Sequence, residues 1–185
     1  MRVLAGELKG RKLTTPRGRT TRPTADHVRI ACLDTLMPFV GRGPFLDLFA
    51  GSGAVGIEAL SRGAPAAVFA EDDAMALRAL RDNVEALGLA DRARVMRSDA
   101  ARAVATLGAH GSRFAVAFLD PPYESPRGAP ALAALAEGAC LLPGAVVVLQ
   151  HATRTPPALV DGGALTLWKA RKFGETTLTF LRGPA

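Results

Sequence analysis

The chain has 185 residues, 49% of them hydrophobic, which is enough for one domain with a sizeable buried core. No apolar run approaches the roughly 18 residues of a membrane span, and the first residues lead into basic sequence instead of a signal-peptide core, so we expect a cytoplasmic protein outside the membrane. Cys32 and Cys140 are far apart in apolar patterns and the three histidines show no ligand spacing, which argues for buried thiols and against a disulfide or a metal site.

The formal net charge of +6 lies at the N-terminal end of the chain. Residues 1–22 hold seven basic residues and one acidic residue, and the rest of the chain holds 16 of each kind. A basic leader beside a neutral body suggests a bound polyanion. We therefore divide the chain into a basic extension over residues 1–22, called the leader below, and a main domain over residues 23–185. Gly6 and Gly10 favour a small hairpin for the extension, and a solvated disordered tail is the alternative.

A helix is predicted from about Ala25 to Met37. Thr24 is a suitable N-cap, and apolar residues recur along this stretch at helical spacing. Pro38 and the glycine-containing turn over residues 41–44 should end the helix and lead into the first strand.

The stretch from Phe45 to Glu58 reads as a short apolar strand, a glycine-rich turn and the start of a helix. Gly51, Gly53 and Gly56 fit the pattern G-x-G-x-x-G, in which glycines allow a tight turn and a close approach of the backbone to a ligand. This shape is typical of a nucleotide-cofactor site, although the pattern by itself has low specificity.

Two carboxylates decide which cofactor the turn favours. Glu71, twenty residues beyond Gly51, ends the next apolar run and could accept hydrogen bonds from ribose hydroxyls. Asp47 precedes the glycines where the pyrophosphate of a dinucleotide would pass, and its charge would repel a phosphate. S-adenosylmethionine (SAM) has no phosphate and carries an ammonium and a sulfonium, so we expect SAM instead of a nicotinamide cofactor. An ordinary strand-to-helix turn capped by Asp47 is the non-functional alternative.

From the turn onward, apolar strands alternate with helices, as in parallel α/β proteins. The predicted strands are Phe45 to Phe49, Ala66 to Ala70, Ala93 to Met96, Phe114 to Leu119, Ala145 to Leu149, Ala164 to Ala170 and Thr176 to Leu181. The predicted helices are Ala54 to Ser61, about Asp73 to Leu87, Ala100 to Leu107, and one marked by Leu132, Leu135, Ala136 and Ala139. The last two strands should form an antiparallel hairpin through a turn near Phe173 and Gly174. We expect an α/β fold whose seven-stranded sheet has five parallel strands, a C-terminal hairpin and helices on both faces.

The tetrapeptide Asp120-Pro-Pro-Tyr123 directly follows a predicted strand, so it should lie at the C-terminal edge of the sheet, where ligands bind in open α/β folds. Two prolines make a stiff turn with exposed carbonyls, Asp120 adds an acceptor, and Tyr123 adds a ring that can stack on a base. These groups suit an exocyclic amine on a planar nucleobase, because acceptors for its two N–H groups would direct the nitrogen lone pair toward a methyl donor. A proline-rich loop capped by Asp120 is the alternative.

Asp99 and Ala100 follow the third predicted strand, near where an adenine ring would lie. Asp99 is equally suited to cap the helix that begins there.

The chain resembles a known family, the bacterial guanine-N2 methyltransferases of small-subunit (16S) ribosomal RNA, called the RsmD family. The similarity rests on the motif from Arg22 to Arg29, on the motif from Asp47 to Gly63, and on Asp120-Pro-Pro-Tyr123. The resemblance implies the class I SAM-dependent methyltransferase fold and the transfer of a methyl group from SAM to the N2 amine of a guanine in 16S ribosomal RNA. The partner would be ribosomal RNA, free or within the small subunit, and we expect a monomer.

The residues expected to act follow from the motifs and from this resemblance. The expected catalytic residues are Asp120, Pro121, Pro122 and Tyr123. The expected cofactor-binding residues are Asp47, Phe49, Gly51, Ser52, Gly53, Glu71, Asp99 and Ala100. The expected RNA-binding residues are Lys9, Arg11, Lys12, Arg17, Arg19, Arg22 and Arg29.

The chain departs from the family pattern at two positions of the first motif. His27 stands where an arginine is usual, and Ile30 stands where a polar or acidic residue is common.

Three alternatives remain at the level of the sequence: a nicotinamide-dependent oxidoreductase on the same turn, a methyltransferase for adenine N6 in RNA or DNA, and a non-catalytic RNA-binding module for ribosome assembly. Asp47 and the absence of an obvious Tyr and Lys pair for hydride transfer disfavour the first.

Overall fold

The computed structural model describes residues 1–16, 26–122, 125–137, 140–157 and 163–184. The helices are α1 (Asp26–Val40), α2 (Ala54–Ser61), α3 (Ala74–Ala86), α4 (Ala100–Ala109) and α5 (Gly128–Ala136). The strands are β1 (Phe45–Leu48), β2 (Ala67–Glu71), β3 (Ala93–Arg97), β4 (Phe114–Leu119), β5 (Leu141–Ala152), β6 (Thr166–Phe173) and β7 (Thr176–Arg182). Every predicted strand and helix of the main domain is present, with ends shifted by a few residues.

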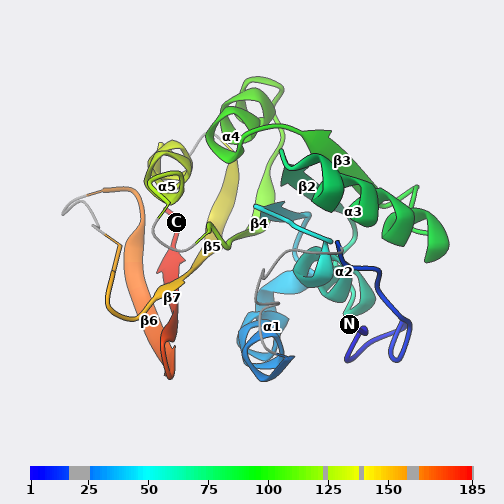
Figure 1. Ribbon diagram of the computed structural model, residues 1–185. Helices are drawn as coiled ribbons and strands as arrows, with labels where there is room; N and C mark the ends of the chain where they lie inside the picture. Colours follow the sequence, from blue (N-terminus) through cyan, green and yellow to red (C-terminus); the bar gives the residue numbers. More distant parts are fainter. Residues whose placement is uncertain (17–25, 123–124, 138–139, 158–162, 185) are drawn as a thin grey trace.

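All seven strands form one twisted sheet in the order β3-β2-β1-β4-β5-β7-β6 (Figure 1). Strands β1 to β5 are parallel, and β7 pairs antiparallel with both β5 and β6. The fold predicted from the sequence, including the C-terminal hairpin, is therefore confirmed. The pairing of β1 with β4 places Leu48 opposite Leu119, so the chain leaves both strands at adjacent points of one sheet edge.

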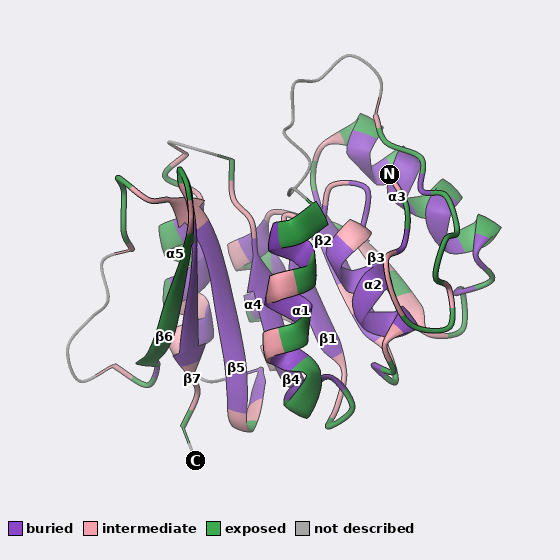
Figure 2. Cartoon of the chain, turned by 90° about the horizontal axis from the view of Figure 1, so that it is seen from below, coloured by how far each residue is buried: buried purple, intermediate pink, exposed green. Residues whose placement is uncertain are grey.

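Helices cover both faces of the sheet and enclose two separate cores (Figures 1 and 2). One core joins α1, α2 and α3 to the sheet, and the other joins α4 and α5 to the opposite face. The central strand β4 is buried along its whole length, as its uninterrupted apolar sequence predicts. Cys32 and Cys140 are buried free thiols in different cores, on opposite faces of the sheet, as expected.

Two of these shifted boundaries have a clear physical cause. Helix α1 continues through Pro38 to Val40, because a proline in the last turn removes only one backbone hydrogen bond and Phe39 and Val40 gain burial in the core. Strand β5 begins at Leu141, which pairs with Phe114 of β4, and runs to Ala152, which pairs with Thr176 of β7. The expected cap Thr24 lies outside the described residues.

Candidate active site

The glycine-rich turn reverses the chain between β1 and α2. Phe49, Gly51 and Gly53 all have positive φ angles, of 62°, 56° and 82°, a region that glycine enters without strain. A Cβ atom on Gly53 would lie 2.3 Å from the Leu80 side chain, and one on Gly56 would lie 2.3 Å from Phe69. Gly53 therefore allows the turn to pack closely against α3, and Gly56 allows α2 to pack closely against β2. A Cβ on Gly51 would meet no atom within 4 Å, so that position faces open space.

Asp47 lies beneath this turn and is only 2% exposed. Its Oδ2 accepts a hydrogen bond of 2.9 Å from the backbone N–H of Gly56, in the first turn of α2. Burial raises the pKa of the Asp47 carboxyl well above its ordinary value; the Gly56 hydrogen bond opposes this shift, and the neighbouring Asp120 and Glu71 carboxylates add to it. Asp47 thus combines a bond to the helix with an electrostatic environment that a nearby cation would relieve.

Glu71 connects the end of β2 to the glycine-rich turn. Its Oε2 accepts a hydrogen bond of 2.7 Å from Gly51 N–H, and its Oε1 accepts bonds from the N–H groups of Asp72 and Asp73, at 2.9 and 2.8 Å. A carboxylate has about four lone-pair positions, so Glu71 keeps the capacity to accept a ligand hydroxyl as well. The sequence predicted this carboxylate beside the turn, but it gave no indication that Glu71 holds the turn through a hydrogen bond from the Gly51 backbone.

Asp99 is the N-cap of α4. Its Oδ1 accepts hydrogen bonds from Ala101 N–H and Arg102 N–H, at 3.0 and 3.3 Å. The capping role that the sequence left open is therefore confirmed. Its other oxygen, Oδ2, lies 3.5 Å from Arg127, so the residue also faces the edge of the site.

Arg127 reaches across the sheet edge from the loop that follows β4. Its guanidinium donates to Asp72 and Asp99, and its Cζ lies 5.8 Å from the centre of the Phe49 ring. The hydrogen bond to Asp72 raises the pKa of Arg127 further. Sequence reasoning missed both Arg127 and Asp72, because neither belongs to a motif and their meeting depends on the order of the strands.

Asp120 and Pro121 stand beside the cofactor turn, because β4 is the neighbour of β1. Asp120 N–H donates to Leu48 C=O at 3.4 Å, and Asp120 is half-buried. Pro121 packs against Gly128 at the start of α5, where a Cβ atom would lie 2.8 Å from the Pro121 ring. Pro122 is exposed, and its carbonyl accepts a hydrogen bond from Ser125 N–H. Tyr123 lies outside the described residues.

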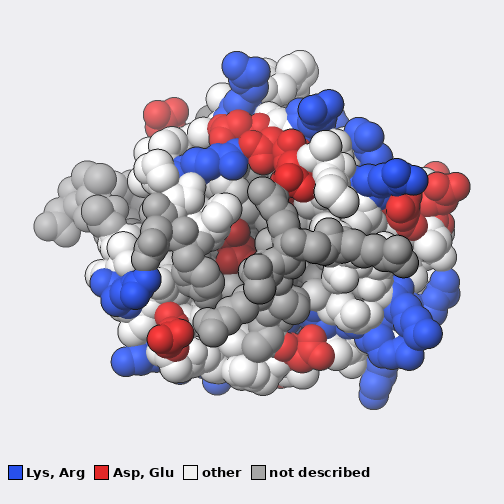
Figure 3. Space-filling view, in the orientation of Figure 1, with Lys and Arg blue, Asp and Glu red and all other residues white. Residues whose placement is uncertain are grey.

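Carboxylates from the ends of four neighbouring strands thus gather at one sheet edge. The residues are Asp47, Glu71, Asp72, Asp99 and Asp120, of which Asp47 and Glu71 are buried. Figure 3 shows acidic side chains gathered on this face of the molecule. This set of carboxylates fits a cationic cofactor without phosphate such as SAM, and it would repel a dinucleotide. Within the described ranges, no group of three or more His, Cys, Asp or Glu side chains could hold a metal ion.

The leader is a hairpin that is docked on the main domain. Arg2 and Lys12 form an antiparallel bridge, and Val3 and Leu13 are buried in the core beneath α1 and α2. Gly6 and Gly10 both have positive φ angles, so the predicted hairpin is confirmed over the described residues 1–16.

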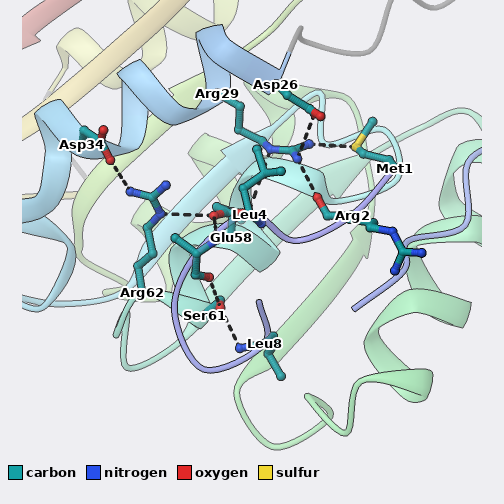
Figure 4. A network of polar contacts seen from close by, with 12 residues as sticks. Met1, Arg2, Leu4, Leu8, Asp26, Arg29, Asp34, Glu58, Ser61 and Arg62 are labelled. Atoms are coloured by element: carbon teal, nitrogen blue, oxygen red, sulfur yellow. Dashed lines mark hydrogen bonds and ion pairs between the residues drawn. The ribbon is translucent and has the colours of Figure 1, made fainter. Parts of the chain in front are cut away.

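Helix α2 holds the leader through its polar side chains (Figure 4). The two carboxylate oxygens of Glu58, which is fully buried, accept hydrogen bonds of 2.8 Å from Leu4 N–H and Ala5 N–H. Ser61 Oγ donates to Ala5 C=O and accepts from Leu8 N–H. The alternative of a solvated tail is therefore wrong for this part of the chain.

The predicted RNA-binding residues divide into three groups. Lys9, Arg11 and Lys12 are exposed on the leader, while Arg17, Arg19 and Arg22 lie outside the described residues. Arg29 requires a correction, because its side chain is buried and its guanidinium bonds to Met1 Sδ, to Arg2 C=O and to Asp26 (Figure 4). Arg29 fixes the leader to α1 and has no surface to offer RNA. The neighbouring departures from the family pattern, His27 and Ile30, are both exposed.

Comparisons with known proteins agree with this geometry. The family model described as "Conserved hypothetical protein 95" matches residues 1–182. "Putative rRNA methyltransferase YlbH" of Bacillus subtilis is 38% identical over 82% of this chain and 82% of that protein. "Ribosomal RNA small subunit methyltransferase D" of Haemophilus influenzae is 31% identical over 94% of this chain and 89% of that protein. The structure of YhhF from Escherichia coli superposes with a TM-score of 0.85 and 29% identity, covering 100% of this chain and 98% of that one.

No helix in the described part of the chain is long and apolar enough to cross a membrane.

Proposed function

The chain belongs to the RsmD family, whose model spans nearly all of it, and from this premise we propose that it transfers a methyl group from SAM to the exocyclic N2 amine of a guanine in 16S ribosomal RNA. The names of its relatives support ribosomal RNA as the substrate. The observation that carries the proposal is the position of Asp120 and Pro121 beside the glycine-rich turn, fixed by the pairing of β1 with β4. The enzyme acts in the cytoplasm as a monomer.

The cofactor would be held by the turn and by the carboxylates around it. The sulfonium of bound SAM supplies an electrophilic methyl group. Glu71 would accept hydrogen bonds from the ribose hydroxyls, and Asp47 beneath the turn would attract the positive charge. Phe49, Gly51, Ser52 and Gly53 would line the backbone side of the cofactor. Asp99 and Ala100 would lie beside the adenine ring.

The substrate amine is a poor nucleophile because its lone pair is delocalised into the purine ring. The Asp120 carboxylate and the Pro121 carbonyl would accept hydrogen bonds from its two N–H groups. This arrangement favours a pyramidal nitrogen whose lone pair faces the methyl carbon. The new N–C bond would form as the S–C bond of SAM breaks, with S-adenosylhomocysteine as the leaving group. One N–H proton then passes to Asp120 or to water, which restores a neutral amine. Pro122 stiffens the turn, and Tyr123 would stack on the guanine.

Incubation with methyl-labelled SAM tests this proposal directly. The substrates are 16S ribosomal RNA alone, assembled small subunits, and a duplex DNA of similar length. Digestion to nucleosides should place the label in N2-methylguanosine, and mapping would locate the modified base. Label in N6-methyladenosine would replace the proposed base by the alternative one. Tight RNA binding without label in any nucleic acid would favour the non-catalytic assembly module instead.

A further inference from the structure

Strand β6 forms an exposed edge of the sheet, on the far side of α1 from the leader (Figure 2). All its residues except the last are exposed, and Leu167 and Trp168 are 59% and 37% exposed. Cations on an edge strand commonly protect it from pairing with another chain. An exposed leucine and tryptophan have the opposite effect, so protection alone does not account for this strand.

Aromatic rings and cations alternate along the side of β6 that faces α1. Arg182 Cζ lies 4.4 Å from the centre of the Phe39 ring and 4.5 Å from that of Trp168, and Lys169 Nζ lies 5.1 Å from Trp168. Phe39 and Phe180 hold the Trp168 ring by edge-on packing at 5.8 and 6.1 Å. The indole is therefore fixed in orientation, with the Arg182 and Lys169 cations over its ring, while more than a third of the residue stays open to solvent. A base that stacks on this ring would displace the exposed Lys169 side chain.

The register of the sheet connects this surface to the active-site edge. Asp120 follows Leu119, whose partner is Leu149; the next residue of β5, Gln150, pairs with Leu178, and Leu178 pairs with Arg171. Arg171 thus lies three strands away from Asp120 in the same row, a separation of about 14 Å. Strand β6 also runs in the same direction as β4. Arg171 and Lys172 therefore lie toward the C-terminal ends of the parallel strands, the end of the sheet where Asp120 lies.

Charge separates the two surfaces within a body whose formal charges balance. The carboxylates gather at the active-site edge, whereas the β6 side carries cations. We define the β6 strip as this set of residues: Arg42, Trp168, Lys169, Arg171, Lys172 and Arg182. Lys169 and Arg171 lie on the face of β6 toward α1, and Lys172 lies on the opposite face of this exposed edge strand. We propose that the β6 strip binds a single-stranded segment of RNA next to the target guanine, with phosphates on its lysines and a base stacked on Trp168. This inference rests on the proposed function and adds a second RNA contact, across α1 from the leader.

The first test uses Trp168 as its own reporter, because it is the single tryptophan of the chain. Titration with a single-stranded RNA oligonucleotide should quench its fluorescence to saturation, and SAM should leave the signal unchanged. A duplex RNA of the same length should quench less. Tight RNA binding with no change in fluorescence would overturn the stacking contact.

The second test compares two charge-matched double variants. Lys169→Gln/Lys172→Gln removes two exposed cations from β6, and Arg94→Gln/Arg97→Gln removes two exposed cations with the same spacing from β3, the opposite edge strand. Each phosphate contact contributes about 0.7 to the slope of log affinity against log salt for single strands, so the β6 variant should flatten that slope by about 1.4 and the β3 variant should leave it unchanged. Equal slopes for both variants would overturn the inference.

Trp168 variants complete the experiment. Trp168→Ala should weaken RNA binding by roughly fivefold or more with the salt slope unchanged, because a stacked base contributes through its ring. Trp168→Phe keeps a ring in the Phe39 and Phe180 packing and should retain most of the affinity, which separates lost stacking from unfolding. If the wild-type protein methylates RNA and all β6 variants bind RNA normally, the β6 strip is refuted and the proposed function stands. A wild-type protein that neither binds nor methylates RNA would refute the proposed function.

Discussion

Asp47→Asn is expected to stabilise the cofactor-free protein at neutral pH and to weaken its hold on SAM. The Asp47 carboxyl is 2% exposed, and its burial raises its pKa well above the ordinary value. Asparagine keeps a carbonyl oxygen that can accept the 2.9 Å hydrogen bond from Gly56 N–H, and it has no charge to bury. The same substitution removes the negative charge that would attract the sulfonium and ammonium of SAM.

The sign of the pH dependence follows from the direction of that pKa shift. A carboxyl whose pKa is higher in the folded protein contributes its full stability below the unfolded value of about 3.9, and the contribution is lost as pH rises through the folded value. Each pKa unit corresponds to about 1.4 kcal/mol, or roughly 3–6 °C in Tm for a chain of this size. The wild-type protein should therefore lose stability relative to Asp47→Asn as pH rises from about 4 into the neutral range.

Thermal unfolding between about pH 4 and pH 8 measures this difference. Asp82→Asn, an exposed substitution on α3, is the control and should follow the wild-type profile. Saturating SAM should raise the Tm of the wild-type protein more than that of Asp47→Asn. A variant less stable than the wild type at every pH, with unaltered SAM affinity, would refute the reasoning, because the carboxylate would then be favourable in its buried position.

Three further predictions address the cofactor, the chemistry and the leader. Glu71→Ala should weaken SAM binding in calorimetry by about 1.5–3 kcal/mol, because it removes a charged acceptor and releases Gly51 N–H; tight NADH binding without SAM binding would reverse the choice of cofactor. Asp120→Ala should leave SAM affinity within a few fold and slow single-turnover methylation by about a hundredfold or more, whereas an equal loss of binding and rate would place Asp120 in the cofactor site. If roughly four of the seven basic residues of the leader touch phosphate, replacement of five of them by Gln should flatten the salt slope of RNA binding by about 2–3 with normal SAM binding, and an unchanged slope would show that the leader does not touch phosphate. The five residues are Arg11, Lys12, Arg17, Arg19 and Arg22.

The sheet was predictable because its signals are local. The apolar run from Phe114 to Leu119 is long enough to be a strand and short enough to exclude a helix, and the observed strand has the same bounds. Gly51 and Gly53 adopt the positive φ angles that a strand-to-helix turn requires, so the turn was visible in the sequence too. The end of α1 was not predictable in this way, since the burial of Phe39 and Val40 outweighs the breaking effect of Pro38.

Side-chain partners far apart in sequence were not predictable in this way. Arg29 belongs to a motif with basic neighbours, and its charge alone suggests an exposed RNA contact. Its burial depends on the leader folding back over α1, which brings the Met1 sulfur and the Arg2 carbonyl to the guanidinium. Arg127 meets Asp72 and Asp99 only because the loop after β4 crosses the ends of β2 and β3. Neither contact leaves a periodic pattern that a single sequence could show.

Helix α2 connects the glycine-rich turn to the leader. Its first turn is fixed by Asp47 through Gly56, directly after the glycine-rich turn, and its last turn holds the leader through Glu58 and Ser61. An eight-residue helix is about 12 Å long, so the basic hairpin and the cofactor turn are attached to one short rigid rod. RNA held by the leader would therefore have a fixed position relative to the methyl donor. The target base would have to leave its stack to reach Asp120, and phosphate contacts on both sides of α1 would supply the energy that this requires.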